Sequence, residues 1–125
     1  DGSDVTIIAT GTLVSRALAA AAELKAEGIS ARVINLSTVS PLDTAEILAA
    51  AKETKAIITA EESVTRGGVG GAVAEFVVQN HPVPMKLMGI DSFAPTGSAT
   101  FLLEHFGLTA DSIVASAREL LKHGK

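Results

Sequence analysis

The chain has 125 residues, of which 47% are hydrophobic and only 3% aromatic, a size that suits one domain with one core. Ten basic against 14 acidic residues give a formal charge of −4, which repels nucleic acid backbones and anionic lipid. The absence of cysteine excludes a disulfide framework or a catalytic thiolate, and no apolar run approaches the roughly 20 residues that span a bilayer. We therefore predict a soluble, cytoplasmic domain that binds neither nucleic acid nor membrane.

The first half of the chain predicts strand, helix, strand and helix in turn. A β-branched run over residues 5–10 indicates a strand, and the Ala-rich segment 13–27 indicates a helix that Gly28 ends. Residues 31–36 form the second predicted strand. After a turn, Asp43 or Thr44 can cap a helix that runs to about Thr54. We interpret residues 1–125 as one domain, in which residues 1–4 are a linker from a missing upstream domain.

The middle of the chain continues the alternation. Residues 56–60 predict a third strand, and residues 61–71 form a polar, glycine-rich loop. A helix over residues 72–79 follows, which Pro82 cannot continue.

The last third predicts a fourth strand over residues 85–90, a loop over 91–97 and a short helix over 98–106. Thr109 then caps a final helix whose apolar residues recur at three- and four-residue spacing. The alternation of strand and helix predicts the α/β class, with a mostly parallel sheet and helices on both faces.

Two carboxylates, a basic residue and four glycines follow the third strand. The candidate site residues here are Glu61, Glu62, Ser63, Arg66, Gly67, Gly68, Gly70 and Gly71. A glycine-rich helix start can bind an anion, but the segment lacks the Lys-Ser/Thr ending of a Walker loop, and Val73 stands where a dinucleotide fingerprint has its third glycine. We favour the alternative, in which the glycines allow a tight turn and close helix packing, while one glutamate caps backbone amides or meets a partner protein.

The loop after the fourth strand is the second candidate. It could shape a pocket mouth or a contact surface, or be an ordinary turn, and its candidate residues are Asp91, Ser92, Phe93, Thr96 and Gly97. The three histidines, His81, His105 and His123, lie far apart in sequence and lack the spacing of a helical metal pair. We assign no catalytic, metal or cofactor-binding residue.

Several short motifs occur in the same order as in a known family. They are the segment 5–11, Arg32-Val33-Ile34-Asn35 followed by Pro41-Leu42-Asp43, Thr59-Ala60-Glu61-Glu62 leading into Gly67-Gly68-Val69-Gly70, the segment 89–93, and Phe106-Gly107-Leu108-Thr109. Together they resemble the C-terminal domain of transketolases over nearly the whole chain. Ser63 departs from the pattern, because many relatives have a histidine after the two glutamates.

The resemblance implies a three-layer α/β/α sandwich around a five-stranded mixed sheet with one antiparallel strand. It also implies that thiamine diphosphate and Mg²⁺ or Ca²⁺ sit between a pyrophosphate-binding and a pyrimidine-binding domain, which this chain lacks. The domain would then serve packing and assembly in an enzyme that transfers two-carbon ketol units between sugar phosphates. Its expected partners are those two domains, in the same chain or another subunit, in a homodimer or a split-subunit assembly.

Two alternatives stay open. The chain could be the C-terminal domain of another thiamine diphosphate enzyme, such as 1-deoxyxylulose-5-phosphate synthase or the β subunit of a 2-oxoacid dehydrogenase. It could also be a stand-alone module that binds a small anion or a nucleotide.

Overall fold

The fold is taken from a computed structural model, which describes residues 2–10, 13–36, 44–64, 69–90 and 109–123. Strands and helices alternate along these residues. The strands are β1 (Val5–Ala9), β2 (Ala31–Asn35), β3 (Ala56–Val64) and β4 (Met85–Ile90). The helices are α1 (Leu13–Ala26), α2 (Thr44–Glu53), α3 (Val69–Asn80) and α5 (Ala110–His123). The predicted loop over 91–97 and helix over 98–106 lie outside the described residues.

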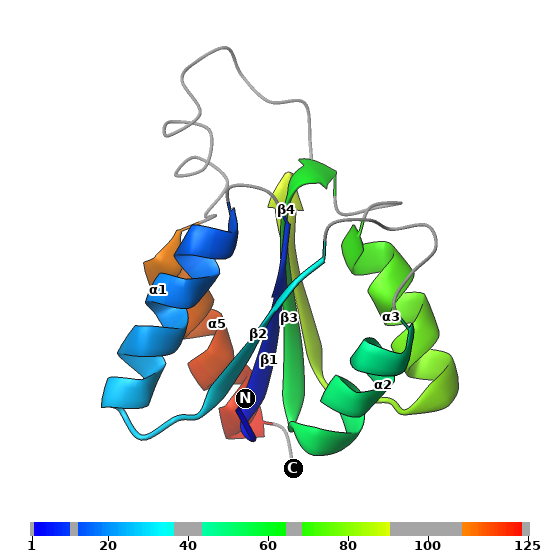
Figure 1. The fold of residues 1–125 in the computed structure, drawn as a ribbon, viewed down its shortest axis with the longest axis horizontal. Coiled ribbons are helices and arrows are strands. Elements are labelled where there is room, and N and C mark those ends of the chain that lie inside the picture. Colours follow the sequence, from blue (N-terminus) through cyan, green and yellow to red (C-terminus); the bar gives the residue numbers. More distant parts are fainter. Residues whose placement is uncertain (1, 11–12, 37–43, 65–68, 91–108, 124–125) are drawn as a thin grey trace.

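The sheet is the middle of three layers. Its strand order is β2-β1-β3-β4, and every neighbouring pair is parallel. Helices α1 and α5 cover one face of the sheet, while α2 and α3 cover the other (Figure 1). The predicted α/β sandwich is confirmed. The described residues contain four parallel strands rather than the five expected with one antiparallel, so the fifth strand is not found in this part of the chain.

The strand β1 shows why the sheet is buried on both faces. Its odd residues, such as Ile7, pack against α1 and α5, whereas Ile8 packs against α2 and α3. All five residues of β1 are buried, as expected for a central parallel strand covered by helices on both sides. Each fully buried isoleucine stabilises the fold by roughly 1.5–3 kcal/mol.

Two helix ends follow the chemistry of the sequence. Gly28 adopts a φ of 82° after α1, and the Ile29 N–H donates to the Leu24 carbonyl at 2.9 Å, which closes the helix in a Schellman arrangement. At the start of α5, the Ser112 N–H donates to Thr109 Oγ1 at 3.2 Å. The predicted stop at Gly28 and the predicted cap at Thr109 are both confirmed.

The segment before β1 is tied to two turns of the domain. The Ser30 N–H donates to Asp4 Oδ2 at 2.7 Å, and the Asp4 N–H donates to the Ser30 carbonyl at 2.9 Å. The Lys55 N–H donates to the Asp4 carbonyl at 2.9 Å. Gly2 is buried, and a Cβ there would lie 2.6 Å from the Arg32 nitrogen. The described part of the predicted linker, residues 2–4, therefore packs as part of the domain.

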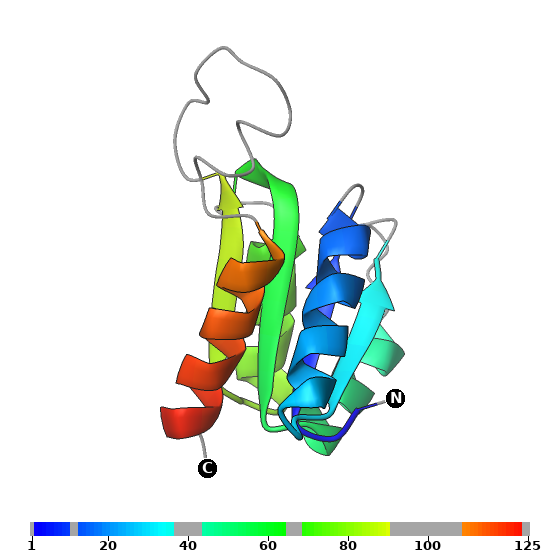
Figure 2. The ribbon, with the colours of Figure 1, turned by 90° about the vertical axis from the view of Figure 1, so that its left-hand side faces the viewer.

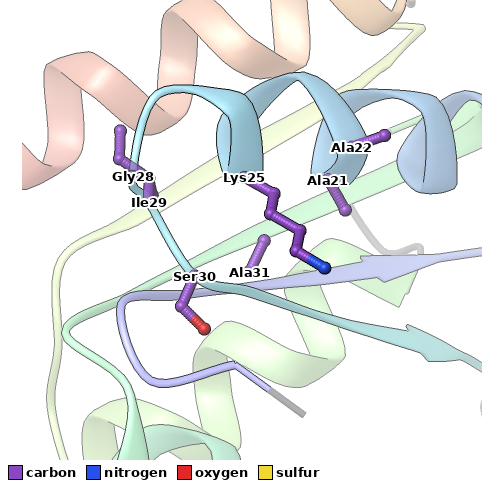
Figure 3. A pocket seen from close by; sticks show the side chains of 7 residues that line it. All are labelled: Ala21, Ala22, Lys25, Gly28, Ile29, Ser30 and Ala31. Carbon is purple, nitrogen blue, oxygen red and sulfur yellow. The ribbon is translucent and has the colours of Figure 1, made fainter.

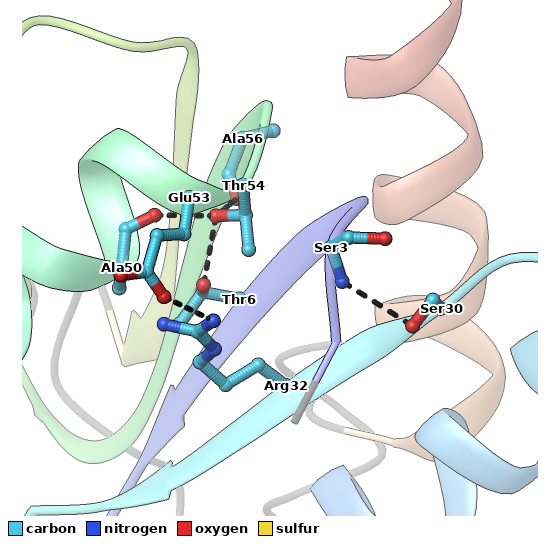
Figure 4. A network of polar contacts seen from close by, with 8 residues as sticks. All are labelled: Ser3, Thr6, Ser30, Arg32, Ala50, Glu53, Thr54 and Ala56. Atoms are coloured by element: carbon cyan, nitrogen blue, oxygen red, sulfur yellow. Dashed lines mark hydrogen bonds and ion pairs between the residues drawn. The ribbon is translucent and has the colours of Figure 1, made fainter.

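A pair of buried threonines joins β1 to the end of α2. The Thr54 hydroxyl donates to the Ala50 carbonyl at 2.7 Å, and it lies 2.8 Å from the Thr6 hydroxyl (Figure 4). Because the single Thr54 proton is used on Ala50, the Thr6 hydroxyl donates to Thr54. Both polar side chains are thus satisfied inside the core.

The largest difference from the sequence prediction lies between β3 and α3. The loop predicted over residues 61–71 is mostly regular structure, because β3 continues to Val64 and α3 begins at Val69. Beyond Ala60, where pairing with β1 ends, β3 still pairs with β4 after a register shift. Pairing with β4 therefore keeps these polar residues of β3 in a strand, although their composition predicts a loop.

Candidate functional site

The described candidate residues meet where β3 ends and α3 begins. Glu61, Glu62 and Ser63 lie on β3, and Gly70 and Gly71 lie in the first turn of α3. This is the carboxyl edge of the parallel sheet, where α/β proteins usually bind ligands. The remaining candidates fall outside the described residues, and they are Arg66, Gly67, Gly68, Asp91, Ser92, Phe93, Thr96 and Gly97.

The Glu61 side chain caps helix α3. It is 1% exposed, and its Oε2 accepts a hydrogen bond from the Gly70 N–H at 2.6 Å. The first N–H groups of a helix have no partner within the helix, and a carboxylate there also faces the positive end of the helix dipole. Glu61 therefore supplies, from the neighbouring strand, the acceptor that a capping side chain usually provides from just before the helix.

Gly70 sits where α3 touches the sheet most closely. A Cβ at this position would lie 2.7 Å from Thr59 Oγ1 and 2.9 Å from Leu87 Cγ, closer than real Cβ contacts allow. Thr59 is fully buried on β3, and its hydroxyl has no hydrogen-bond partner among the described residues. The glycine thus serves close packing of helix on sheet, which is the role that we favoured from the sequence.

These contacts define what the junction can do chemically. The Gly70 N–H, which a phosphate cradle would need, already donates to Glu61, and the buried carboxylate occupies the space in front of it. Among the described residues, no group of three or more His, Cys, Asp or Glu side chains could hold a metal ion. Within the described part of the chain, the junction is a packed joint between strand and helix.

Two hollows lie away from this edge and were not foreseen in the sequence. One has a volume of about 520 Å³ and is lined by the end of α1 and the start of β2 (Figure 3). The other, of about 440 Å³, lies on the opposite face of β2 beside α2. Neither hollow contains a candidate residue. The sequence gives little indication of these hollows, because the hollow beside α1 is lined mostly by alanines and a single lysine.

None of the described helices is long and apolar enough to cross a membrane. The described residues form a parallel α/β domain with helices on both faces of its sheet. Residues 1–113 match the family described as transketolase, C-terminal domain, and the chain belongs to that family.

Relatives extend the match over almost the whole chain. A 6-deoxy-6-sulfo-D-fructose transketolase subunit, SqwH, from Clostridium sp. (strain MSTE9) is 46% identical over 121 residues, which are 96% of this chain and 38% of the relative. A 1-deoxy-D-xylulose-5-phosphate synthase from Heliobacterium modesticaldum is 44% identical over 95% of this chain and 19% of the relative.

A solved structure shares the fold. It is a split gene transketolase described as an inactive β4 tetramer, and it superposes with a TM-score of 0.94 at 38% identity over 100% of this chain and 41% of that chain. The present chain therefore spans at most about two fifths of the length of these relatives.

Proposed function

We propose that the chain is the assembly domain of a transketolase-type enzyme that moves two-carbon ketol units between sugar phosphates. Membership of the family and the similarity to transketolase subunits support this proposal. The observation that carries the assembly role is the Glu61–Gly70 bond, which closes the helix start with the protein's own carboxylate instead of leaving it for a ligand.

The proposed partners are a pyrophosphate-binding and a pyrimidine-binding domain, in the same chain or in another subunit, within a homodimer or a split-subunit enzyme. Those domains would hold thiamine diphosphate and Mg²⁺ or Ca²⁺, and the cofactor supplies the carbanion chemistry when bound. Among the residues that the structure describes, no group of three or more His, Cys, Asp or Glu could hold the metal ion. We also place the assembly in the cytoplasm, which the absence of cysteine favours.

The carboxyl edge of the sheet is the proposed contact surface. The Glu61 side chain bonds the start of α3 at this edge; Glu62 and Ser63 follow it on β3, and Gly71 lies in the first turn of α3. Polar residues at the rim of an interface change association more than they change folding.

Co-purification with the two partner domains tests the proposal. Replacing both Glu62 and Arg66 with alanine should weaken association, while Glu75→Ala on the exposed side of α3 is the matched control and should leave it unchanged. Unchanged association of the double variant would count against this contact surface. Calorimetric titration of the chain with ATP, NAD and sugar phosphates should give no heat, and a saturable heat would favour the anion-binding alternative.

The similarity to a 1-deoxy-D-xylulose-5-phosphate synthase supports a second candidate, the same domain in an enzyme of that kind. The two candidates share the assembly role and differ only in the reaction of the whole enzyme. Assaying the reconstituted enzyme for ketol transfer and, separately, for 1-deoxyxylulose 5-phosphate formation distinguishes them.

A further inference from the structure

Residues 2–4 carry the chain into the domain at the amino end of the parallel strands (Figure 2). This end lies opposite the junction of β3 and α3, which is at the carboxyl end of the sheet. The sequence predicts a linker here, and a linker made of Gly, Ser and Asp is expected to be flexible. In the structure, however, this entry segment is bonded to two connections of the domain.

Asp4 is the residue of the entry segment that makes most of these bonds. Its N–H donates to the Ser30 carbonyl at 2.9 Å, and its Oδ2 accepts a hydrogen bond from the Ser30 N–H at 2.7 Å. Its carbonyl accepts a hydrogen bond from the Lys55 N–H at 2.9 Å. The N–H, the C=O and the carboxylate of one residue thus all have partners, and these partners are distant in sequence.

The partners of Asp4 lie in connections that follow helices on opposite faces of the sheet. Ser30 lies between α1 and β2, and Lys55 lies between α2 and β3. Helices α1 and α2 cover different faces (Figure 1). Asp4 therefore ties the entry segment to both helical layers at once, so a rotation of the segment toward one face stretches its bonds to the other.

The two residues before Asp4 add further restraints. Gly2 is buried, and a Cβ there would lie 2.6 Å from both the Ala31 carbonyl oxygen and the Arg32 nitrogen, so a larger residue does not fit without a shift of the backbone. The Ser3 N–H donates to Ser30 Oγ at 3.2 Å (Figure 4). Each residue of the entry segment is thus either bonded to the domain or packed against it.

We propose that Asp4 is a positioning residue that fixes the direction in which the preceding chain enters the domain, so that residues 2–4 form a rigid coupling and not a hinge. The bond from the Ser30 N–H to the Asp4 carboxylate is the strongest of the set, because its acceptor is charged. The ion pair between Lys55 Nζ and Asp4 Oδ1, at 3.6 Å, adds little, because the Lys55 side chain is 61% exposed. Replacing the carboxylate alone is therefore enough to loosen the coupling.

A rigid coupling has a consequence for the proposed assembly. This chain matches 38% of the SqwH relative and 41% of the solved structure, so most of each relative lies outside the matched region. Domains joined by a flexible linker usually move relative to one another. Where a pyrimidine-binding domain precedes this one in the same chain, a hinge between the two would lie before Gly2. This consequence rests on the proposed function, whereas the rigidity of residues 2–4 does not.

Two spin labels measure the direction of the entry segment. The chain has no cysteine, so Ser3→Cys and Val78→Cys, at two exposed positions, give the only two labelled sites. We expect a narrow distribution of distances between the labels, and Asp4→Ala should broaden it. Asp111→Ala removes an exposed carboxylate from α5, is the matched control and should leave the distribution unchanged. A distribution that is already broad, or that Asp4→Ala leaves narrow, would overturn the proposal.

Hydrogen exchange separates the coupling from general stability. The amides of residue 4, Ser30 and Lys55 donate the bonds between the entry segment and the two connections. In Asp4→Ala these amides should lose protection by about tenfold or more, while the amide of Ile7, fully buried on β1, should change much less. An equal loss at Ile7 would show that Asp4 serves stability alone and would overturn the proposal. Neither experiment measures association or ketol transfer, so a failure here leaves the proposed function standing.

Discussion

Replacing Glu61 tests whether its buried carboxylate holds the junction of β3 and α3. In Glu61→Ala the Gly70 N–H loses its acceptor while staying buried. A hydrogen bond to a charged group contributes about 1.5–3 kcal/mol, and its interaction with the helix dipole adds roughly 0.3–1 kcal/mol. We therefore expect the free energy of unfolding to fall by about 2–4 kcal/mol. Glu61→Gln keeps an acceptor oxygen but not the charge, so we expect a loss of about 1–2 kcal/mol.

Urea unfolding followed by circular dichroism measures these losses. With a slope of about 2 kcal/mol/M, the midpoint of Glu61→Ala should fall by roughly 1–2 M, and that of Glu61→Gln by about half as much. Glu75→Ala, an exposed change on the same helix, should stay within about 0.5 kcal/mol of the wild type. A Glu61→Ala midpoint equal to that of Glu75→Ala would refute the capping role.

Three further changes test other parts of the fold. Gly70→Ala should destabilise by about 1–3 kcal/mol in urea unfolding, despite the better helix propensity of alanine, because its Cβ would press on Thr59; a stabilised variant would show that the helix can shift. Gly28→Ala should cost roughly 1–2 kcal/mol through its φ of 82° alone, since no atom lies within 4 Å of the added Cβ, and Gly28→Asn should cost less. The hydrogen bond from Arg118 lowers the pKa of the Glu27 carboxyl in the folded protein. The stabilisation that this bond gives is therefore present above the pKa of about 4.3 that the carboxyl has in the unfolded chain, and it is lost as pH falls through the pKa of the folded state. Thermal melts should therefore show Glu27→Gln below the wild type at pH 7 and level with it in strong acid; a difference that grows in acid would contradict this sign.

The sequence was most informative where one local pattern decides the structure. Gly28 needed a left-handed conformation, Thr109 could reach a free helix amide, and the β-branched run at β1 could only be a buried strand. These elements were predicted within a residue or two of their observed ends. Each depends on neighbours in the chain rather than on distant partners.

The junction at Glu61 was harder to predict because its partners come from different elements. The residues after Ala60 are polar, and only their pairing with β4 keeps them in a strand. The capping residue of α3, Glu61, lies nine residues before Gly70, so a search for capping motifs next to the helix does not find it. The role of Gly70 likewise depends on Thr59 and Leu87, which the fold brings beneath the helix.

The position of β2 at the border of the described sheet could not be predicted from the sequence either. The five residues Ala31–Asn35 predict a strand without showing whether it lies at the centre or at the border of a sheet, and only the strand order shows that β2 has one neighbour among the described strands. The resemblance to transketolases, by contrast, came from many weak motifs in order, and family membership over residues 1–113 confirms it.

Ketol transfer by the chain alone and with added pyrophosphate- and pyrimidine-binding domains is the most direct test of the assembly role. We expect no transfer by the chain alone at any thiamine diphosphate or Mg²⁺ concentration, and transfer only when both partner domains are present. Turnover by the 125-residue chain by itself would contradict it.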